Sequence, residues 1–197
     1  MANTDVTAIL LAAGRGRRFD PLGARNKLLQ PLPGGDPIVV ASARTLLAVF
    51  ARVVAVVPPQ DGGVAAQLRA LGCEVTVCPQ ADDGMGLSLA HAVRYCVTGT
   101  MPAQGWLVAL GDMPFVHAST LQALAGAIRD GAGIAAPVFQ GRRGNPVAFG
   151  LRHAAALQAL DGDQGARRLL ATHPVTTLDT LDAGILRDID SPADLPS

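Results

Sequence analysis

The segment from Ala8 to Phe19 is an apolar run that continues directly into a loop of glycines and arginines. Glycines let backbone N–H groups approach a bound anion closely, and Gly14 and Gly16 stand in this loop. Guanidinium groups donate paired hydrogen bonds to phosphate oxygens. The loop carries three of them, on Arg15, Arg17 and Arg18. The junction therefore predicts a phosphate-binding site at the end of a core strand.

Neither of the common phosphate motifs is complete in this loop. The dinucleotide fingerprint requires a third glycine where this chain has Phe19, and the ATP-type loop ends in Gly-Lys-Ser or Gly-Lys-Thr. A Gly-x-Gly pair alone is often an ordinary turn. The preceding strand and the arginines are what favour an anion site over a turn.

A second candidate group follows another apolar run, Trp106–Leu110, in the sequence Gly111-Asp112-Met113-Pro114. Ligands of open parallel sheets bind beyond the carboxyl ends of the strands, so Asp112 is expected at the same edge as the arginine loop. Magnesium is commonly held by one or two carboxylates together with substrate phosphates. The alternative is that Asp112 caps the following helix. The arginine loop favours the metal.

Lys27 is the only lysine in the chain, and arginine supplies all the other permanent positive charges of its side chains. A compact ammonium on a flexible stem can reach the β- and γ-phosphates of a nucleotide bound at the preceding loop. The alternative is a solvated loop residue.

A further glycine loop, Gly84–Leu89, opens a helical pattern whose free N–H groups suit a sugar, base or phosphate. A plain turn with Ser88 near the helix start explains it equally well.

Composition is that of a soluble globular protein with enough apolar residues for a large core. The chain has 197 residues, of which 49% are hydrophobic and 16% charged, and its formal net charge is zero. Zero net charge argues against a nucleic-acid partner, whereas a local basic loop for a small nucleotide is compatible with it. We find no apolar stretch of membrane-spanning length and no signal-peptide pattern, and expect a cytoplasmic protein with no membrane partner.

Three cysteines are expected to be reduced thiols in or near the core, because no Cys-x-x-Cys pair occurs and the histidines are scattered singly. They are Cys73, Cys78 and Cys96.

Short apolar or β-branched runs alternate with helical patterns through the first two thirds of the chain. The expected strands are Val6–Leu11, Arg52–Val57, Glu74–Val77, Trp106–Leu110 and Ile134–Pro137. Continuous runs of this kind are typical of strands buried on both faces, with helices covering each side of a parallel sheet. The C-terminal third, with a further short run at Val147–Phe149, is expected to add an antiparallel edge within one domain spanning residues 1–197.

Four of the segments above and two further polar loops follow one another along the chain in the order of a known family. They are Leu11–Phe19, Lys27–Leu29, Gly84–Leu89, Gly111–Pro114, Gly141–Pro146 and Gly162–Arg167. Together they resemble the MobA-like nucleotidyltransferases, most closely the molybdenum cofactor cytidylyltransferases, from Ile9 to about Leu195. The Ala-Ala-Gly opening is similar to the cytidylyl branch, whereas the guanylyl branch more often has Ala-Gly-Gly. The resemblance implies an α/β, Rossmann-like three-layer sandwich of the nucleotide-diphospho-sugar transferase type. Its central sheet would be mostly parallel with a small antiparallel C-terminal edge.

The resemblance also implies a reaction. It is the Mg²⁺-dependent transfer of a cytidylyl group from CTP to the phosphate of a molybdopterin-type cofactor, giving molybdopterin cytosine dinucleotide and pyrophosphate. A molybdoenzyme or its chaperone would be the protein partner. One alternative is a related transferase that uses GTP, or a sugar or alcohol phosphate as acceptor. Another is a carrier that binds a nucleotide or cofactor for a molybdoenzyme without turnover.

Roles follow position by position from the same resemblance, with a nucleotide half at about residues 1–115 and an acceptor half at about 116–197. The catalytic residues would be Arg18 and Lys27 on the triphosphate and Asp112 on the metal. Further nucleotide-binding residues would be Leu11, Ala12, Ala13, Gly14, Gly16, Gly86, Ser88 and Gly111. The acceptor-binding residues would be Arg143, Gly144, Asn145, Asp163, Arg167 and Asp190.

Two features depart from the family pattern. The connection from the arginine loop to Lys27 is lengthened by Asp20–Asn26. Asn145 stands where relatives usually have histidine, and asparagine can hydrogen-bond but cannot carry a proton at neutral pH. The second departure concerns the acceptor more than the nucleotide half.

Overall fold

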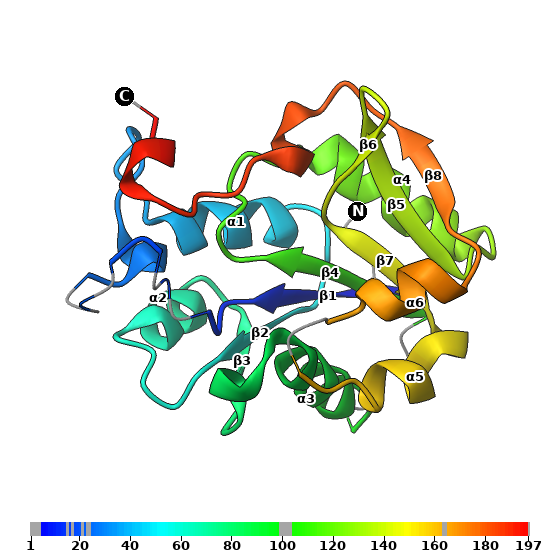
Figure 1. Cartoon of the computed structure of the whole chain (residues 1–197), viewed down its shortest axis with the longest axis horizontal. Helices are drawn as coiled ribbons and strands as arrows, with labels where there is room; N and C mark the ends of the chain where they lie inside the picture. Colours follow the sequence, from blue (N-terminus) through cyan, green and yellow to red (C-terminus); the bar gives the residue numbers. More distant parts are fainter. Residues whose placement is uncertain are drawn as a thin grey trace.

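The strands of this protein form one mixed sheet in the computed structural model, which describes residues 5–14, 16, 18–20, 22, 25–98, 104–162 and 165–196. The strands are β1 (Val6–Leu11), β2 (Val53–Val57), β3 (Glu74–Val77), β4 (Gly105–Leu110), β5 (Ile134–Phe139), β6 (Arg142–Arg143), β7 (Val147–Gly150) and β8 (Thr176–Asp179). Within the described residues their order is β3-β2-β1-β4-β7-β5-β6, and β8 pairs with β5 (Figure 1).

Four adjacent strands, β3, β2, β1 and β4, are parallel, with Ala8 opposite Val53 and Val6 opposite Gly105. Every residue of β1 and β2 is buried. Successive side chains of a strand point to opposite faces, so Leu10 enters one core and Ile9 the other. A strand covered on both faces has no polar side, which explains the continuous apolar runs. The predicted fold class is confirmed.

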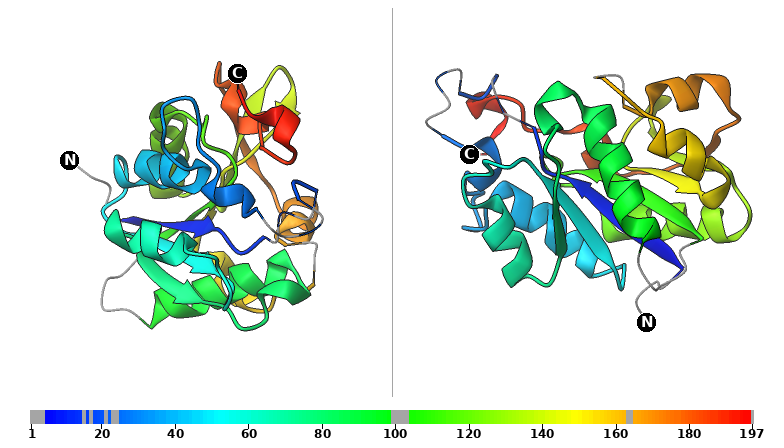
Figure 2. Two further views of the ribbon diagram at one scale, coloured as in Figure 1. Left: turned by 90° about the vertical axis from the view of Figure 1, so that its left-hand side faces the viewer. Right: turned by 90° about the horizontal axis from the view of Figure 1, so that it is seen from below.

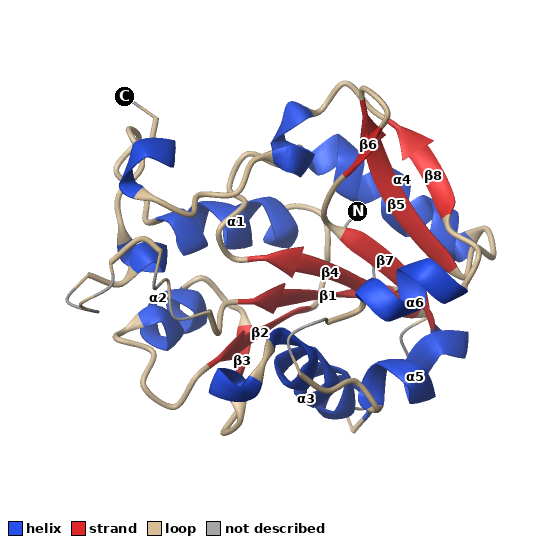
Figure 3. Cartoon of the chain, in the orientation of Figure 1, coloured by secondary structure: helices blue, strands red, loops and turns tan. Residues whose placement is uncertain are grey.

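Helices cover both faces of this sheet (Figures 2 and 3). The core on one face includes side chains from α1 (Ile38–Leu47), α2 (Val64–Ala70) and α4 (Ala118–Arg129). The core on the other face includes side chains from α3 (Met85–Val97), α5 (Ala154–Gln158) and α6 (Arg167–Thr172). In the part of the chain that the structure describes, no helix has the length and apolar character needed to cross a membrane.

Short 3-10 helices lie in the connections between these elements. They are η1 (Lys27–Leu29), η2 (Ala81–Asp83), η3 (Leu151–His153), η4 (Ala183–Leu186) and η5 (Pro192–Asp194). The first and the last two matter most for function, because they carry or flank charged residues at the carboxyl ends of β1 and β4.

The C-terminal third adds antiparallel strands as expected, but not all of them lie at an edge and one added strand is parallel. β7 is antiparallel to both of its neighbours and lies inside the sheet between β4 and β5. β8 runs parallel to β5, with Ala135 opposite Thr176, and was not expected from the sequence. Three of its four residues are exposed, so it lacks the apolar pattern by which the buried strands are detected. Its place in the sheet comes from backbone hydrogen bonding to β5.

The cysteines are free and buried, as predicted. Burial raises the pKa of Cys73 and of Cys96 to about 11 in each case. At neutral pH both groups are therefore neutral thiols, which are poor nucleophiles and poor metal ligands.

We expect the free energy of unfolding to fall as the pH rises from 9.0 towards about 11. In this window unfolding releases protons, because the thiols of the unfolded chain ionise near 9.0 while those of the folded chain stay protonated. Cys96→Ser should reduce the fall, since serine does not titrate there. Urea midpoints at about pH 8 and about pH 10.5 measure the effect. Equal falls in wild type and variant would contradict the assignment.

Candidate active site

A pocket of about 390 Å³ lies at the carboxyl ends of β1 and β4. These strands are adjacent and parallel, so the loops that follow them emerge at the same edge of the sheet. The pocket is lined by Leu11, Ala13, Gly14, Lys27, Leu28, Ala81, Asp82, Gly84, Met85, Ser88, Leu110 and Asp112. An adjoining hollow of about 950 Å³ shares Gly14 and Leu28 with it and is also lined by Ala12. The structure thus brings together most of the residues expected to bind the nucleotide.

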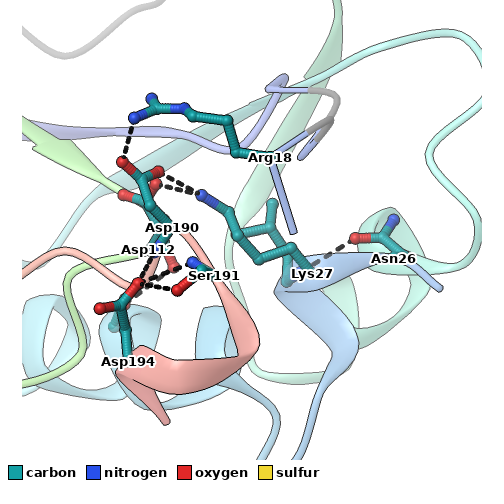
Figure 4. A network of polar contacts seen from close by, with 10 residues as sticks. Arg18, Asn26, Lys27, Asp112, Asp190, Ser191 and Asp194 are labelled. Atoms are coloured by element: carbon teal, nitrogen blue, oxygen red, sulfur yellow. Dashed lines mark hydrogen bonds and ion pairs between the residues drawn. The ribbon is translucent and has the colours of Figure 1, made fainter. Parts of the chain in front are cut away.

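Four charged side chains from distant parts of the chain meet beside this pocket (Figure 4). The ammonium Nζ of Lys27 lies 2.7 Å from Oδ2 of Asp112 and 3.3 Å from Oδ1 of Asp190. A guanidinium nitrogen of Arg18 lies 2.6 Å from Oδ2 of Asp190. The side chain of Lys27 is only 9% exposed, whereas that of Arg18 is 79% exposed. The cluster therefore has a buried ammonium at its centre and a solvated guanidinium at its rim.

A third carboxylate, that of Asp188, lies next to this cluster. Burial raises the pKa of Asp188, and the negative charges of Asp190 and Asp112 raise it further. Like charges disfavour ionisation in this way when they share a site with few cations. Asp188 therefore favours its neutral form more than an exposed aspartate does.

The donor set at Asp112 fits a divalent cation. Its Oδ1 is buried and has no hydrogen-bond partner among the described residues, a costly state for a carboxylate oxygen unless a ligand satisfies it. No cluster of three or more His, Cys, Asp or Glu side chains in the described ranges could hold a metal by itself. A cation here would take Asp112 and Asp190 from the protein, and phosphate oxygens and water for the rest, as Mg²⁺ commonly does.

The alternative role for Asp112, as the cap of the following helix, is not what the structure shows. α4 begins at Ala118, and its N-cap residue is His117. Asp112 instead lies directly beyond β4 and faces Lys27.

Lys27 reaches the site from η1, whose first turn is fixed by Asn26. The Asn26 side chain accepts a hydrogen bond from the N–H of Leu28 at 3.0 Å and donates one to the carbonyl of Asp61 at 2.9 Å. Gly16 has φ +58°, and a Cβ there would lie 3.0 Å from Cβ of Lys27. Gly16 therefore makes room for Lys27 in the structure.

Asp20 joins the described residues of the lengthened connection before Lys27. Its carboxylate accepts hydrogen bonds from the backbone N–H of Leu22 at 3.0 Å and of Arg25 at 2.7 Å. The side chain of Phe19, which precedes it, is buried. Lys27 meets Asp112 despite the longer path.

Asp188 and Asp190 belong to a C-terminal strap, defined here as residues Asp182–Asp194. At its centre the N–H of Ile189 donates to the carbonyl of Asp112 at 3.0 Å, and the Ile189 side chain is fully buried. At its end, Oδ2 of Asp194 accepts hydrogen bonds from the N–H of Asp190 and from both the N–H and the hydroxyl of Ser191. These hydrogen bonds lower the pKa of Asp194, those from Ser191 most strongly.

The strap begins at a buried carboxylate that the sequence analysis did not single out. Asp182 accepts hydrogen bonds from the N–H of His117 at 2.7 Å, the hydroxyl of Thr120 at 2.7 Å and the N–H of Gly184 at 2.9 Å. Both His117 and Thr120 lie at the start of α4. The strap is therefore attached to α4 at one end, to the loop after β4 at its centre and to its own terminal turn at the other end.

Two of the residues expected to bind the acceptor contact this strap. The N–H of Asn145 donates to the carbonyl of Ile185 at 2.9 Å, and a Cβ at Gly144 would clash with the same carbonyl. The Asn145–Pro146 peptide bond is cis. Arg143 is exposed on β6, and Arg167 is exposed at the start of α6. Asp163 lies outside the described residues, as do Arg15 and Arg17.

Three residues that were predicted to bind the nucleotide differ in what they contact in the structure. Ser88 on α3 is 2% exposed, lines the pocket, and its hydroxyl has no hydrogen-bond partner among the described residues. Gly86 instead donates its N–H to the carbonyl of Gly162 at 2.8 Å, and a Cβ there would clash with that carbonyl. Gly111 donates its N–H to the carbonyl of Leu11 at 2.9 Å and so joins the two strand ends.

Sequence reasoning missed Asp188, although a signal for it was present. In the run Asp188-Ile189-Asp190, acidic residues flank an apolar residue that the structure buries completely. In an extended segment such alternation places the two acidic side chains on the same side. It missed Asp182 because its partners His117 and Thr120 are remote in sequence. Asp194 stands three residues after Ser191, and the structure shows the capping box that this spacing allows.

Comparison with known proteins places this geometry in a family. The model of the MobA-like NTP transferase domain matches residues 8–177. "Purine catabolism protein PucB" of Bacillus subtilis (strain 168) is 30% identical over 206 residues, covering 98% of this chain and 95% of PucB. "Bifunctional protein GlmU" of Burkholderia multivorans is 40% identical over 127 residues, covering 62% of this chain and 26% of GlmU. The chain thus matches only about a quarter of the length of that relative.

Among solved structures, Rv0371c from Mycobacterium tuberculosis H37Rv superposes with a TM-score of 0.82 at 26% identity, over 98% of this chain and 96% of that one. Rv0371c in complex with manganese gives a TM-score of 0.78 at 26% identity, over 97% of this chain and 96% of that one. Both superpositions extend over almost the whole of this chain.

Proposed function

The chain belongs to the MobA-like NTP transferase family, and on that premise we propose that it transfers a cytidylyl group from CTP to the phosphate of a molybdopterin-type cofactor. The products are molybdopterin cytosine dinucleotide and pyrophosphate. One observation carries the proposal: the only lysine of the chain meets Asp112 at 2.7 Å, in the pocket beside the glycine-arginine loop. Cleavage of a triphosphate requires cationic groups at this place, whereas binding alone does not require an adjacent carboxylate.

In the proposed reaction an oxygen of the acceptor phosphate attacks the α-phosphorus of CTP. A new P–O bond forms while the bond between the α-phosphorus and the bridging oxygen breaks, and pyrophosphate leaves with the electron pair. The acceptor phosphate is already an anion, so no protein nucleophile is needed. Lys27 and Arg18 orient the triphosphate and offset the charge that develops on its oxygens. A divalent cation held by Asp112 and Asp190 would add further charge neutralisation at the reacting phosphate.

The nucleotide half supplies groups suited to a base and ribose. The loop from Ala12 to Gly14 presents backbone groups at the end of β1, and the buried hydroxyl of Ser88 faces the pocket without a partner among the described residues. A buried hydroxyl of this kind is satisfied when a ligand supplies a donor or acceptor. We assign these groups to the cytosine and its ribose.

The C-terminal third offers exposed cations that suit the phosphate of the second substrate. Arg143 on β6 and Arg167 on α6 offer guanidinium groups suited to a phosphate. Asn145 can hydrogen-bond a pterin but cannot donate a proton as histidine does. The proposed molybdopterin acceptor, and the molybdoenzyme or chaperone proposed to receive the product, rest on the family resemblance of the six motifs.

Pyrophosphate release tests the proposal. The protein is mixed with Mg²⁺, molybdopterin cofactor and each of CTP, GTP, ATP and UTP in turn. We expect release that depends on the acceptor and is faster with CTP than with GTP by about tenfold or more, since a pocket that hydrogen-bonds one base leaves groups unpaired with another. Thermal shifts with the same nucleotides provide the parallel binding measurement.

Two outcomes would contradict this function. Faster turnover and stronger stabilisation with GTP would make the cytidylyl assignment wrong. Thermal stabilisation by nucleotide and cofactor without any pyrophosphate release would identify a carrier instead of an enzyme.

A further inference from the structure

The ammonium of Lys27 lies where two carboxylates converge. Its Nζ is within hydrogen-bond distance of Oδ2 of Asp112 and Oδ1 of Asp190, and the residue is 8% exposed. We propose that Lys27 is an internal counter-ion that a divalent cation must displace, so that the cation enters this site together with the nucleotide and not before it. The inference rests on the proposed nucleotidyl transfer but not on which base or acceptor is used.

The charges at this edge of the sheet favour a cation between two carboxylates. Asp112 and Asp190 each place an oxygen close to the same ammonium, at 2.7 and 3.3 Å, and two carboxylates this close repel each other unless a cation lies between them. Arg18 engages only Oδ2 of Asp190 and stays largely in solvent. Lys27 is the group that joins Asp112 to Asp190, so it keeps the two carboxylates together.

The positions of the carboxylate oxygens bring a bound cation against the ammonium. A cation such as Mg²⁺ binds carboxylate oxygens at about 2.0–2.1 Å. Asp112 offers its unpartnered Oδ1, but both oxygens of Asp190 are occupied, Oδ1 by Nζ and Oδ2 by Arg18. A cation that joins Asp112 to Asp190 therefore competes with Nζ, which contacts both carboxylates, and like charges repel at this distance. The flexible four-carbon stem of lysine allows the ammonium to withdraw, provided that another anion receives it.

The described residues supply too few ligands to hold a cation by themselves. The described residues offer no set of three or more protein ligands for a metal. A cation held by Asp112 and Asp190 therefore needs oxygens from another source, and a triphosphate supplies them. The same triphosphate supplies the anion that receives Lys27. Nucleotide binding thus removes the competitor of the cation and completes its coordination, which predicts strong positive coupling between the two ligands.

Manganese binding to the full chain tests this inference, with free Mn²⁺ measured by electron paramagnetic resonance. We expect wild-type protein to bind Mn²⁺ about tenfold or more tightly when CTP is present. Without nucleotide, Lys27→Met should bind Mn²⁺ about tenfold or more tightly than wild type, and its gain on adding CTP should be smaller. The same variant should nevertheless release pyrophosphate more slowly, since it lacks the ammonium that binds the triphosphate.

The matched control is Arg44→Met. Arg44 pairs with Asp36 on the surface at 3.2 Å, so this variant makes the same change in net charge away from the pocket. It should leave Mn²⁺ affinity at the wild-type value, which separates displacement of Lys27 from a general effect of charge.

Two results would overturn the inference. One is a Lys27→Met or Lys27→Gln variant that binds Mn²⁺ no more tightly than wild type without nucleotide. The other needs no variant: wild-type protein that binds Mn²⁺ equally well with and without nucleotide. The measurement with Mn²⁺ alone contains neither base nor acceptor, so a failure of the cytidylyl assignment leaves it intact and can be recognised separately.

Discussion

Asp112→Ala should lower kcat for pyrophosphate release by about a thousandfold or more while leaving the fold intact. Asp112 contacts the buried ammonium at 2.7 Å and offers a second, unpartnered oxygen to a cation. Electrophilic stabilisation of a reacting phosphate contributes several kcal/mol, and each 1.4 kcal/mol corresponds to about tenfold in rate. The fold should survive because the contact between the strap and this residue uses its backbone carbonyl, which accepts from Ile189.

Initial rates of pyrophosphate release, with circular dichroism and a melting curve on the same samples, measure both parts of this expectation. Asp36→Ala is the matched control, because it removes an exposed carboxylate that pairs with Arg44 outside the pocket. The control should keep the wild-type rate. An Asp112→Ala protein with a rate near that of wild type would remove Asp112 from the mechanism.

The parts of the fold that the sequence predicts well are those in which local pattern and topology agree. The apolar runs of β1 and β2 have no polar face, and such strands require cover on both sides. Asp112 was placed by one topological rule, since ligands meet the carboxyl ends of parallel strands. Lys27 stood out because no other lysine occurs in the chain. Their convergence at 2.7 Å agrees with both interpretations.

Glycines show where sequence reasoning reaches its limit. Gly86 and Gly144 were both expected at ligands, on the family resemblance and, for Gly86, on the free N–H groups at a helix start. In the structure a Cβ at Gly86 would strike the carbonyl of Gly162, and one at Gly144 would strike that of Ile185. The residue type reveals that something lies close to the backbone, but only the fold shows whether that neighbour is protein. Gly86 thereby packs against the loop at Gly162, and Gly144 packs against the strap at Ile185.

The position of the strap could not be predicted for a related reason. Asp190 was assigned to the acceptor side, yet its carboxylate bonds both Lys27 and Arg18 beside the nucleotide pocket. That placement depends on long-range contacts, among them the hydrogen bonds that Asp182 accepts from His117 and Thr120. Such contacts join residues more than sixty positions apart, and a local pattern holds no information about them.

Asp182→Ala should be the most destabilising single change at the strap. The Asp182 side chain is 1% exposed. Its loss leaves three donors without an acceptor: the partly buried N–H of His117, and the buried hydroxyl of Thr120 and N–H of Gly184. Each unsatisfied buried donor costs about 1–3 kcal/mol, and we expect the free energy of unfolding to fall by about 3–5 kcal/mol in total. For a chain of this size that corresponds to a decrease in Tm of about 10 °C.

Urea denaturation and Mn²⁺ binding in the presence of CTP separate the two consequences of this change. Asp179→Ala removes an exposed carboxylate from the neighbouring strand β8 and should change the free energy of unfolding by no more than about 0.5 kcal/mol. If the strap holds Asp190 in place, Asp182→Ala protein that is still folded should also bind Mn²⁺ with CTP more weakly than the control. A stability within about 1 kcal/mol of wild type would show that water replaces the carboxylate at α4. Normal Mn²⁺ binding in a destabilised variant would show that the contacts of Ile189 and Asp194 suffice to position Asp190.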